Sequence, residues 1–412
     1  MRIDIKKLTI VTYISAAILA ALIIYSMMTR PTPPSNFTLE TVPTVCGYYS
    51  KSYIDKEIKM TNDMFSKVNK IIEESQPVEE LAPFIYQMNY TYWEAYKYLK
   101  EGDLPKAQYY LLSTMQSADY VISYDEVDSW STDKALSMVR ITYKDYKGKF
   151  NELLSEIKEE EKNMSLEDSL GWLGTVEEKA AKIWFSLNQT EEFLSEVNKQ
   201  KDVQAVPAWR YRMIQALSSM PAIYYYEACD ILKNAKKKGG TFEPDELIDR
   251  LSKQILDEIE KLKKVPESSV IHNEVTEKKL NSWKEEVKAL KRLSDMGLRS
   301  YALRKMIQDL ALLRTYEALS NVSSKSPKVD EILKFRDQVY RELISRESVN
   351  RSWAYEMAAE HLNLAQYMLL FYFKGAIHES WDKLSRAVYT CLYIAKVYPD
   401  EVDEVLSEVL SS

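Results

Sequence analysis

The amino-acid sequence predicts an all-α protein, because two of its features disfavour strands and a third favours helices. Glycine is rare, with nine residues in 412, and no stretch shows the sustained apolar and polar alternation that marks a β-strand. Apolar residues instead recur at spacings of three and four, which places them along one side of a helix. The clearest such stripe comprises Trp353, Met357, His361, Ala365, Met368 and Tyr372. We therefore expect helices that are paired into hairpins.

Residues 8–28 read LTIVTYISAAILAALIIYSMM and contain no charged side chain. At about 1.5 Å rise per residue, a helix of this length crosses the roughly 30 Å hydrocarbon core of a bilayer. A cleaved signal peptide and a buried core helix are the alternatives. The apolar run is longer than the core of a signal peptide, and no small-residue cleavage site follows it. We expect an uncleaved transmembrane signal anchor.

The charges around this segment predict its orientation. Three basic residues precede it with one acidic residue to offset them, whereas Arg30 is the only basic residue between the segment and Lys51. Basic residues accumulate on the cytoplasmic side of a membrane span. We expect a single-pass protein of the cell membrane, with residues 1–7 as a cytoplasmic tail and the C-terminal domain outside.

A Pro/Thr-rich stretch, PTPPSNFTLETVP, begins at Pro31. Such a composition favours extended polyproline II structure and does not build a packed core. We interpret residues 29–45 as a stalk and residues 46–412 as an α-helical ectodomain. Within it, the basic run Lys236–Lys238, followed by two glycines, is typical of a helix end. We place a candidate sub-boundary near residues 239–243.

Residues 244–293 contain two narrow apolar stripes whose other faces are crowded with lysine and glutamate. The stripes comprise Leu251, Ile255, Ile259 and Leu262, then Leu280, Trp283, Val287 and Leu290. This pattern predicts a charged antiparallel helical hairpin, which either projects as a coiled-coil-like arm or flanks the body with a solvated surface. We favour the second interpretation. The next stretch, Leu298 to Leu319, is apolar on most sides and predicts a central helix.

The charge balance argues against a nucleic-acid partner. The chain has a net charge of −7, and residues 1–45 contribute +2, so the remainder carries −9. A phosphate backbone is bound by clustered lysine and arginine, and an anionic surface repels it. We expect no nucleic acid among the partners.

Glycosylation sequons agree with an outside location. Six of the fourteen asparagines stand in Asn-x-Ser/Thr sequons, at Asn36, Asn89, Asn163, Asn188, Asn321 and Asn350. Asn36 lies too close to the membrane segment for modification to be expected. The candidate glycosylation sites are therefore the other five.

The three cysteines, Cys46, Cys229 and Cys391, show neither CxxC spacing nor a Cys/His cluster. Cys229 and Cys391 lie in apolar helical stretches, where a small buried side chain is the ordinary role. Cys46 lies just beyond the stalk in an oxidising exterior. It is a candidate for an interchain disulfide between two copies.

One segment carries the pattern of a known helical repeat. The residues that carry it are Ala95, Tyr98, Gly102 to Leu104, Ala107 and Leu111. This pattern resembles one unit of the tetratricopeptide repeat family, over about residues 89–122. Glu94 and Thr114 depart from the family pattern, which has leucine and alanine at these positions. The resemblance implies stacked helical hairpins, as in an α-solenoid, and a groove that binds a peptide or partner protein without catalysis.

The usual signatures of catalysis are missing from the sequence. It has no HExxH, GxSxG or Walker A motif, and its only histidines are His272, His361 and His378. His361 lies on an apolar helical stripe, where a hydrogen-bonded core histidine is expected. Glu356 and Glu360 stand at helical spacing, which is typical of a solvated face. We expect no catalytic, cofactor-binding or metal site.

These observations predict a membrane-anchored, extracytoplasmic helical scaffold or protein-interaction module. We expect an accessory subunit of an envelope or membrane complex, held in the membrane by residues 8–28, with a protein partner and a capacity to form homo-oligomers. The alternative is an extracytoplasmic, glycan-acting hydrolase of the paired-helix barrel type, which would use two carboxylates and exposed aromatic residues.

Overall fold

The computed structural model describes residues 42, 51–74, 79–346, 352–374, 377 and 379–411. Residues 8–28, Cys46, Asn350 and His378 lie outside the described residues. The longer helices of the described ranges are α2 (Lys51–Glu74), α3 (Ala82–Glu101), α4 (Leu104–Ser129), α5 (Thr132–Glu161), α7 (Gly174–Gln200), α8 (Trp209–Leu217), α9 (Met220–Asn234), α10 (Asp245–Lys261), α11 (Glu277–Asp295), α12 (Arg299–Leu319), α13 (Val329–Arg346), α14 (Ser352–Phe373) and α15 (Trp381–Leu410). The short helical turns are η1 (Glu79–Leu81), α6 (Leu166–Asp168), η2 (Ser169–Leu173), η3 (Val203–Ala205) and η4 (Leu262–Lys264).

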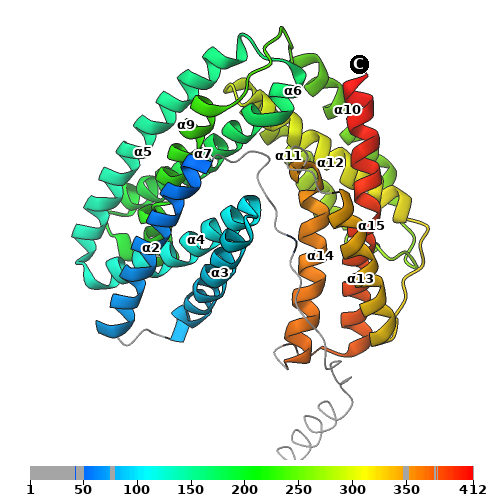
Figure 1. Cartoon of the computed structure of the whole chain (residues 1–412), viewed down its shortest axis with the longest axis horizontal. Helices are drawn as coiled ribbons and strands as arrows, with labels where there is room; N and C mark the ends of the chain where they lie inside the picture. The colour runs from blue at the N-terminus through cyan, green and yellow to red at the C-terminus, as the bar shows by residue number, and fades with distance from the viewer. Residues whose placement is uncertain are drawn as a thin grey trace, which may run out of the picture.

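The helices form an arch with two legs (Figure 1). One leg contains α2, α3 and α4, with α5 along the outer edge of the arch, and the other contains α13, α14 and α15. α10, α11 and α12 lie at the crown. α12 joins the two halves, because it packs against α7 and η2 on one side and against α10, α11, α14 and α15 on its other sides.

The all-α prediction is confirmed for the described residues. None of them lies in a β-strand, and an isolated bridge pairs Ser269 with Ser323. No helix in the described ranges combines the length and apolar character that crossing a bilayer requires. The anchor predicted at residues 8–28 stays a prediction.

The hairpin of α3 and α4 contains the segment that resembles a tetratricopeptide unit. Gly102 ends α3 with a φ of 78°, a left-handed conformation that glycine adopts without a steric penalty. Asp103 then caps α4, because its side chain accepts a hydrogen bond from the Lys106 backbone N–H at 3.3 Å. The predicted packing residues Ala95 and Ala107 are fully buried. The helical hairpin is therefore confirmed at this place.

The charged hairpin predicted at residues 244–293 corresponds to α10 and α11. The two helices run antiparallel, because Glu260 pairs with Lys284 at 2.9 Å while Asp249 pairs with Lys291 at 2.8 Å. Both apolar stripes are buried, and both helices pack on α12. The hairpin thus flanks the body, as we favoured, and does not project as an arm.

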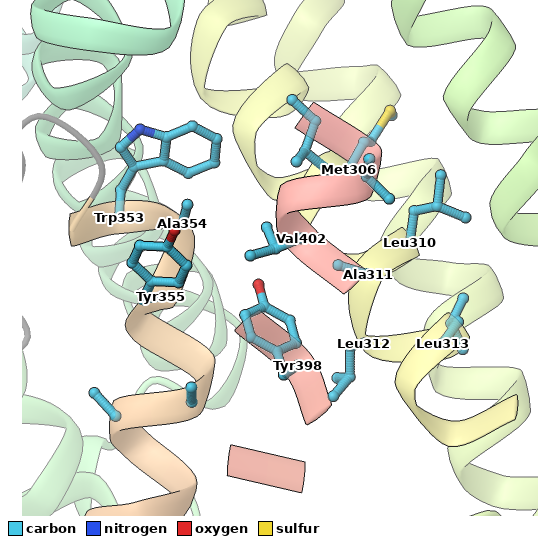
Figure 2. Close-up of a cluster of buried hydrophobic side chains, with 14 of the residues drawn as sticks. Met306, Leu310, Ala311, Leu312, Leu313, Trp353, Ala354, Tyr355, Tyr398 and Val402 are labelled. Carbon is cyan, nitrogen blue, oxygen red and sulfur yellow. The ribbon is translucent and has the colours of Figure 1, made fainter. Parts of the chain in front are cut away.

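The predicted central helix is α12, which is buried on nearly every side. Figure 2 shows Ala311 of α12 beside Val402 of α15, in the same hydrophobic core as Met306, Leu310 and Tyr398. This hydrophobic core includes side chains from both sides of residues 239–243, the segment in which the sequence predicts a sub-boundary. Burial of these apolar surfaces is the main force that holds the two halves of the arch together.

A buried arginine on α12 holds the irregular turn that precedes α7. Turn η2 is π-helical, and Gly171 within it has non-helical dihedrals, φ −98° and ψ −121°. Arg304 donates from Nε to the Leu170 carbonyl at 3.0 Å, from Nη1 to the Thr175 hydroxyl at 3.1 Å, and from Nη2 to the Gly171 carbonyl. Its guanidinium carbon also lies 5.1 Å from the centre of the Trp353 ring of α14. One side chain therefore contacts both halves of the arch.

Two pairs of residues in the sequence, Ser165 with Asp168 and Thr175 with Glu178, have the spacing of a capping box at the start of a helix. Ser165 and Asp168 form the capping box that their spacing predicts. The similar pattern at Thr175 and Glu178 is not a cap, because Thr175 lies inside α7. The basic run also lies beyond a helix end, since α9 already ends at Asn234.

Gly174 is required where Arg304 crosses the start of α7. A Cβ at this position would lie 2.4 Å from Arg304 Nε and 2.7 Å from the Ser169 carbonyl oxygen. We predict that Gly174→Ala lowers the free energy of unfolding by about 1–3 kcal/mol, because a buried side chain and the backbone must shift. Chemical denaturation measures this. The matched control is Gly148→Ala, which meets nothing within 4 Å, so in an exposed part of α5 it should stabilise the chain by up to about 1 kcal/mol. Equal effects of the two substitutions would contradict the account.

Candidate functional site

A groove of about 290 Å³ lies between the legs, near the crown of the arch. We call it the inner groove. α3, α4, α7, α9 and α14 each contribute to it, so it is lined from both legs. The polar residues that line it are Gln87, Gln108, Gln116, Lys179, Lys182, Tyr224 and Glu356. Side-chain amides and ammonium groups of this kind bind carbonyl and carboxylate oxygens.

Two lysines and a tyrosine form one wall of the inner groove. The ammonium nitrogens of Lys179 and Lys182 lie 5.5 Å and 5.6 Å from the centre of the Tyr224 ring, within the range of a cation–π interaction. Lys182 also pairs with Glu178 at 2.6 Å. Burial raises the pKa of Glu178, but Lys182 and Lys179 outweigh this effect and lower it to about 2. Glu178 is therefore ionised at neutral pH.

Glu356 faces this wall from α14 in the opposite leg. Burial raises its pKa, and the negative charges of Glu178 and Glu360 raise it further. Lys182 and Lys305 act in the other direction without cancelling the shift. Glu356, whose pKa is raised, therefore lines the inner groove, while Glu178, whose pKa is lowered, pairs with the lining residue Lys182.

Lys179 connects the inner groove to a cluster of buried charged residues. We call Glu57, Lys179, Glu227 and Asp230 the buried charge cluster. Lys179 and Glu227 are each only 1% exposed, and their Nζ and Oε2 atoms are 2.8 Å apart. Gln108 donates to the other oxygen of Glu227 at 3.5 Å. Since α2, α7 and α9 each supply charges, the cluster ties three helices together.

Glu57 has the least favourable position in this cluster. It is fully buried, and neither carboxylate oxygen meets a well-aligned donor among the described residues. Burial raises its pKa well above the usual range, and the charge of Glu227 adds to this, against the opposing effects of Lys179 and Gln108. A buried carboxyl group in such surroundings is most stable in its protonated form.

Exposed aromatic and aliphatic side chains lie on the two helices that face each other across the arch. α3 exposes Tyr86 and Trp93, and α14 exposes Leu364, Tyr367 and Phe371. Tyr367 also lies close enough to Tyr90 of α3 to affect its titration: burial, and then the neighbouring groups Glu94 and Tyr367, raise the pKa of Tyr90 to about 12. Large exposed apolar side chains in one region indicate an interaction surface.

The candidate glycosylation sites occupy different surroundings. Asn163, Asn188 and Asn321 are exposed, whereas Asn89 is half-buried and donates from its amide to the Ile85 carbonyl at 3.0 Å. Asn350 lies outside the described residues. The exposed sites are accessible to modification, and their use stays a prediction.

The histidine and cysteines singled out in the sequence do not line the inner groove. His361 is half-buried, and its Nδ1 lies 2.8 Å from the Met357 carbonyl oxygen. Cys391 is buried as expected, whereas Cys229 is only half-buried and lines a separate cavity between α2 and α9. Among the described residues, no group of three or more His, Cys, Asp or Glu residues could hold a metal ion.

Sequence reasoning missed the buried charge cluster. Lys179 and Glu227 are far apart in the chain, and each stands in an ordinary helical context with no motif around it. The one signal in the sequence is the position of Lys179, which lies on the same side of α7 as the buried residues Val176 and Ile183, where an apolar residue is expected. A charge on a core-facing position predicts a buried partner.

The raised pKa of Glu57 predicts that stability depends on pH. Because the folded state holds a proton that the unfolded chain releases above about pH 4.3, the free energy of unfolding falls as the pH rises toward the folded pKa. One such group contributes up to about 1.4 kcal/mol per pH unit. We predict that Glu57→Gln makes this decline shallower between about pH 5 and pH 8, as measured by chemical denaturation of the full chain in detergent.

The control for this measurement is Glu73→Gln, which changes an exposed residue of the same helix. It should keep the wild-type dependence on pH. If Glu57→Gln and the wild type lose stability at the same rate as the pH rises, then Glu57 is not held in its protonated form.

Comparison of the chain with protein families, with curated proteins and with solved structures finds no match.

Proposed function

We propose that this chain is a protein-interaction module whose ligand is an extended segment of another protein, bound on the inner side of the arch. The observation that carries the proposal is the inner groove itself, which is lined by helices of both legs. Its glutamines can pair with backbone groups, and Lys182, whose side chain is 42% exposed, can pair with an acidic side chain or a terminal carboxylate. The partner is therefore expected to be an extended, acidic polypeptide.

Two further features support a protein ligand. α3 and α14 lie on opposite sides of the space between the legs (Figure 1), and their exposed aromatic side chains offer contact area for apolar side chains. The resemblance of the α3 and α4 hairpin to a tetratricopeptide unit points in the same direction, because such repeats bind peptides along an inner face.

The predicted anchor determines where in the cell this module would bind its partner. With residues 8–28 in the membrane and the helical part outside, the module would hold its partner at the outer surface of the cell membrane. We propose an accessory subunit of an envelope or membrane complex, glycosylated at its exposed sequons and able to cross-link to a second copy through Cys46.

A bulky residue in the inner groove tests the proposal. We predict that Ser113→Trp lowers the amount of co-purified partner at least about tenfold when the full chain is tagged and solubilised in mild detergent, because the indole fills the space that the ligand needs. Ser113 lines the groove and is half-buried. The control is Ile141→Trp, which places the same indole at a residue that is 58% exposed on α5 at the outer edge of the arch. If both variants retain the partner equally, then the inner groove is not the binding site.

A glycan-acting hydrolase is the alternative function, and one observation favours it. Glu178 and Glu356 have pKa values displaced in opposite directions, which is the arrangement of a glycosidase base and acid. If the alternative holds, Glu356→Gln should lower the release of reducing sugar from cell-surface glycan by at least about 100-fold, while Glu73→Gln at an exposed position of α2 leaves it unchanged. Absence of sugar release by the wild-type chain would exclude this function.

A further inference from the structure

One residue from the N-terminal part of the chain is bound to α14 by its backbone. The Val42 N–H donates to Asn363 Oδ1 at 2.8 Å, and Asn363 Nδ2 donates to the Val42 carbonyl at 2.8 Å. The two residues are 321 positions apart in the sequence. Val42 is 1% exposed and Asn363 is 9% exposed, so water does not compete freely for either bond.

The chemistry of this contact is that of a strand pairing with its neighbour. A side-chain carboxamide offers one acceptor oxygen and one donor NH₂ group, and both are used here on a single residue of the bound chain. An extended residue in a β-ladder exchanges the same pair of bonds with the strand beside it. The two bonds therefore recognise a polypeptide backbone, while the Val42 side chain packs in the hydrophobic core.

The residue that follows Val42 favours an extended conformation at Val42. Pro43 follows it, and a residue before proline is restricted to extended conformations by the proline ring. An extended residue presents its N–H and C=O groups to the side, where one amide group can reach both.

Asn363 belongs to a face of α14 that continues into the inner groove. Glu356, Asn363 and Tyr367 are spaced by seven and four residues, which places them along one side of the helix. Glu356 lines the inner groove, and Tyr367 lies near Tyr90 of α3. Seven helical residues rise about 10 Å, a distance that about three residues of an extended chain cover. A polypeptide held at Asn363 therefore reaches the groove.

We propose that this face of α14 is a seat for an extended polypeptide, that Asn363 is its backbone-reading residue, and that Val42 of the same chain is its occupant in this structure. One part of this proposal rests on the proposed function: a partner segment that enters the inner groove along α14 would come into contact with Val42 at Asn363. The contact of Val42 with Asn363 is itself independent of any partner.

Hydrogen exchange of the full chain in detergent tests the seat without a partner. Mass spectrometry with fragmentation that resolves the Val42 amide gives its exchange rate directly. We expect the Val42 amide to be strongly protected from exchange in the wild type. In Asn363→Leu, which removes both polar groups at similar volume, we expect this amide to exchange about tenfold faster. The matched control, Leu364→Ala, changes the neighbouring residue, which is 50% exposed, and should leave the Val42 rate unchanged.

Three outcomes would overturn the proposal. Free exchange of the Val42 amide in the wild type would show that the seat is empty in solution. Protection that persists in Asn363→Leu would show that another group holds the segment. Protection that increases with protein concentration would show that a second copy supplies the occupant. None of these outcomes depends on partner capture, so failure of the seat and failure of the proposed function are separately detectable.

Discussion

The arch depends on the set of contacts that Arg304 makes at the crown. Its guanidinium group is buried, and it donates hydrogen bonds to two carbonyl oxygens of the π-helical turn η2. The same group lies over Trp353 at the start of α14. A buried cation is costly unless its donors are satisfied, so α12 packs on η2 and α7 in an arrangement that supplies these acceptors. The Trp353 ring adds a contact from α14 to the same side chain.

The inner groove follows from that placement. Lys179 and Lys182 lie in α7 a few residues after η2, and Glu356 lies in α14 one turn after Trp353. The two helices that carry these residues, α7 and α14, therefore both begin beside Arg304, while α3, α4 and α9 supply the other lining residues of the groove. A shift of α14 relative to α7 would separate the lysines from Glu356.

The buried charge cluster gives the first leg its own constraint. Lys179 and Glu227 form a buried ion pair, where the loss of one partner leaves an unpaired charge and costs about 3–5 kcal/mol. Apolar residues at these positions would stabilise the leg as well or better. The ion pair instead favours the one register of α7 on α9 that brings the two charges together.

The sequence predicted the parts of this fold that depend on neighbouring residues. Gly102 and Asp103 end one helix and begin the next through local bonds, Ser165 and Asp168 form a capping box, and the all-round apolar pattern of α12 marks it as central. Thr175 shows the limit of such patterns: a hydroxyl with the spacing of a cap lies inside a helix because Arg304, 129 residues away, binds it. The contact of Val42 with Asn363 joins residues that no local pattern relates.

Site-specific photo-crosslinking in native membranes tests the central claim most directly. A photoreactive residue in place of Gln116, which lines the inner groove, is compared with one in place of Ile141 at the outer edge of the arch. The account predicts that position 116 cross-links reproducibly to one protein and that position 141 does not. Cross-links to that protein from position 141 alone would contradict it, because the partner would then bind outside the arch.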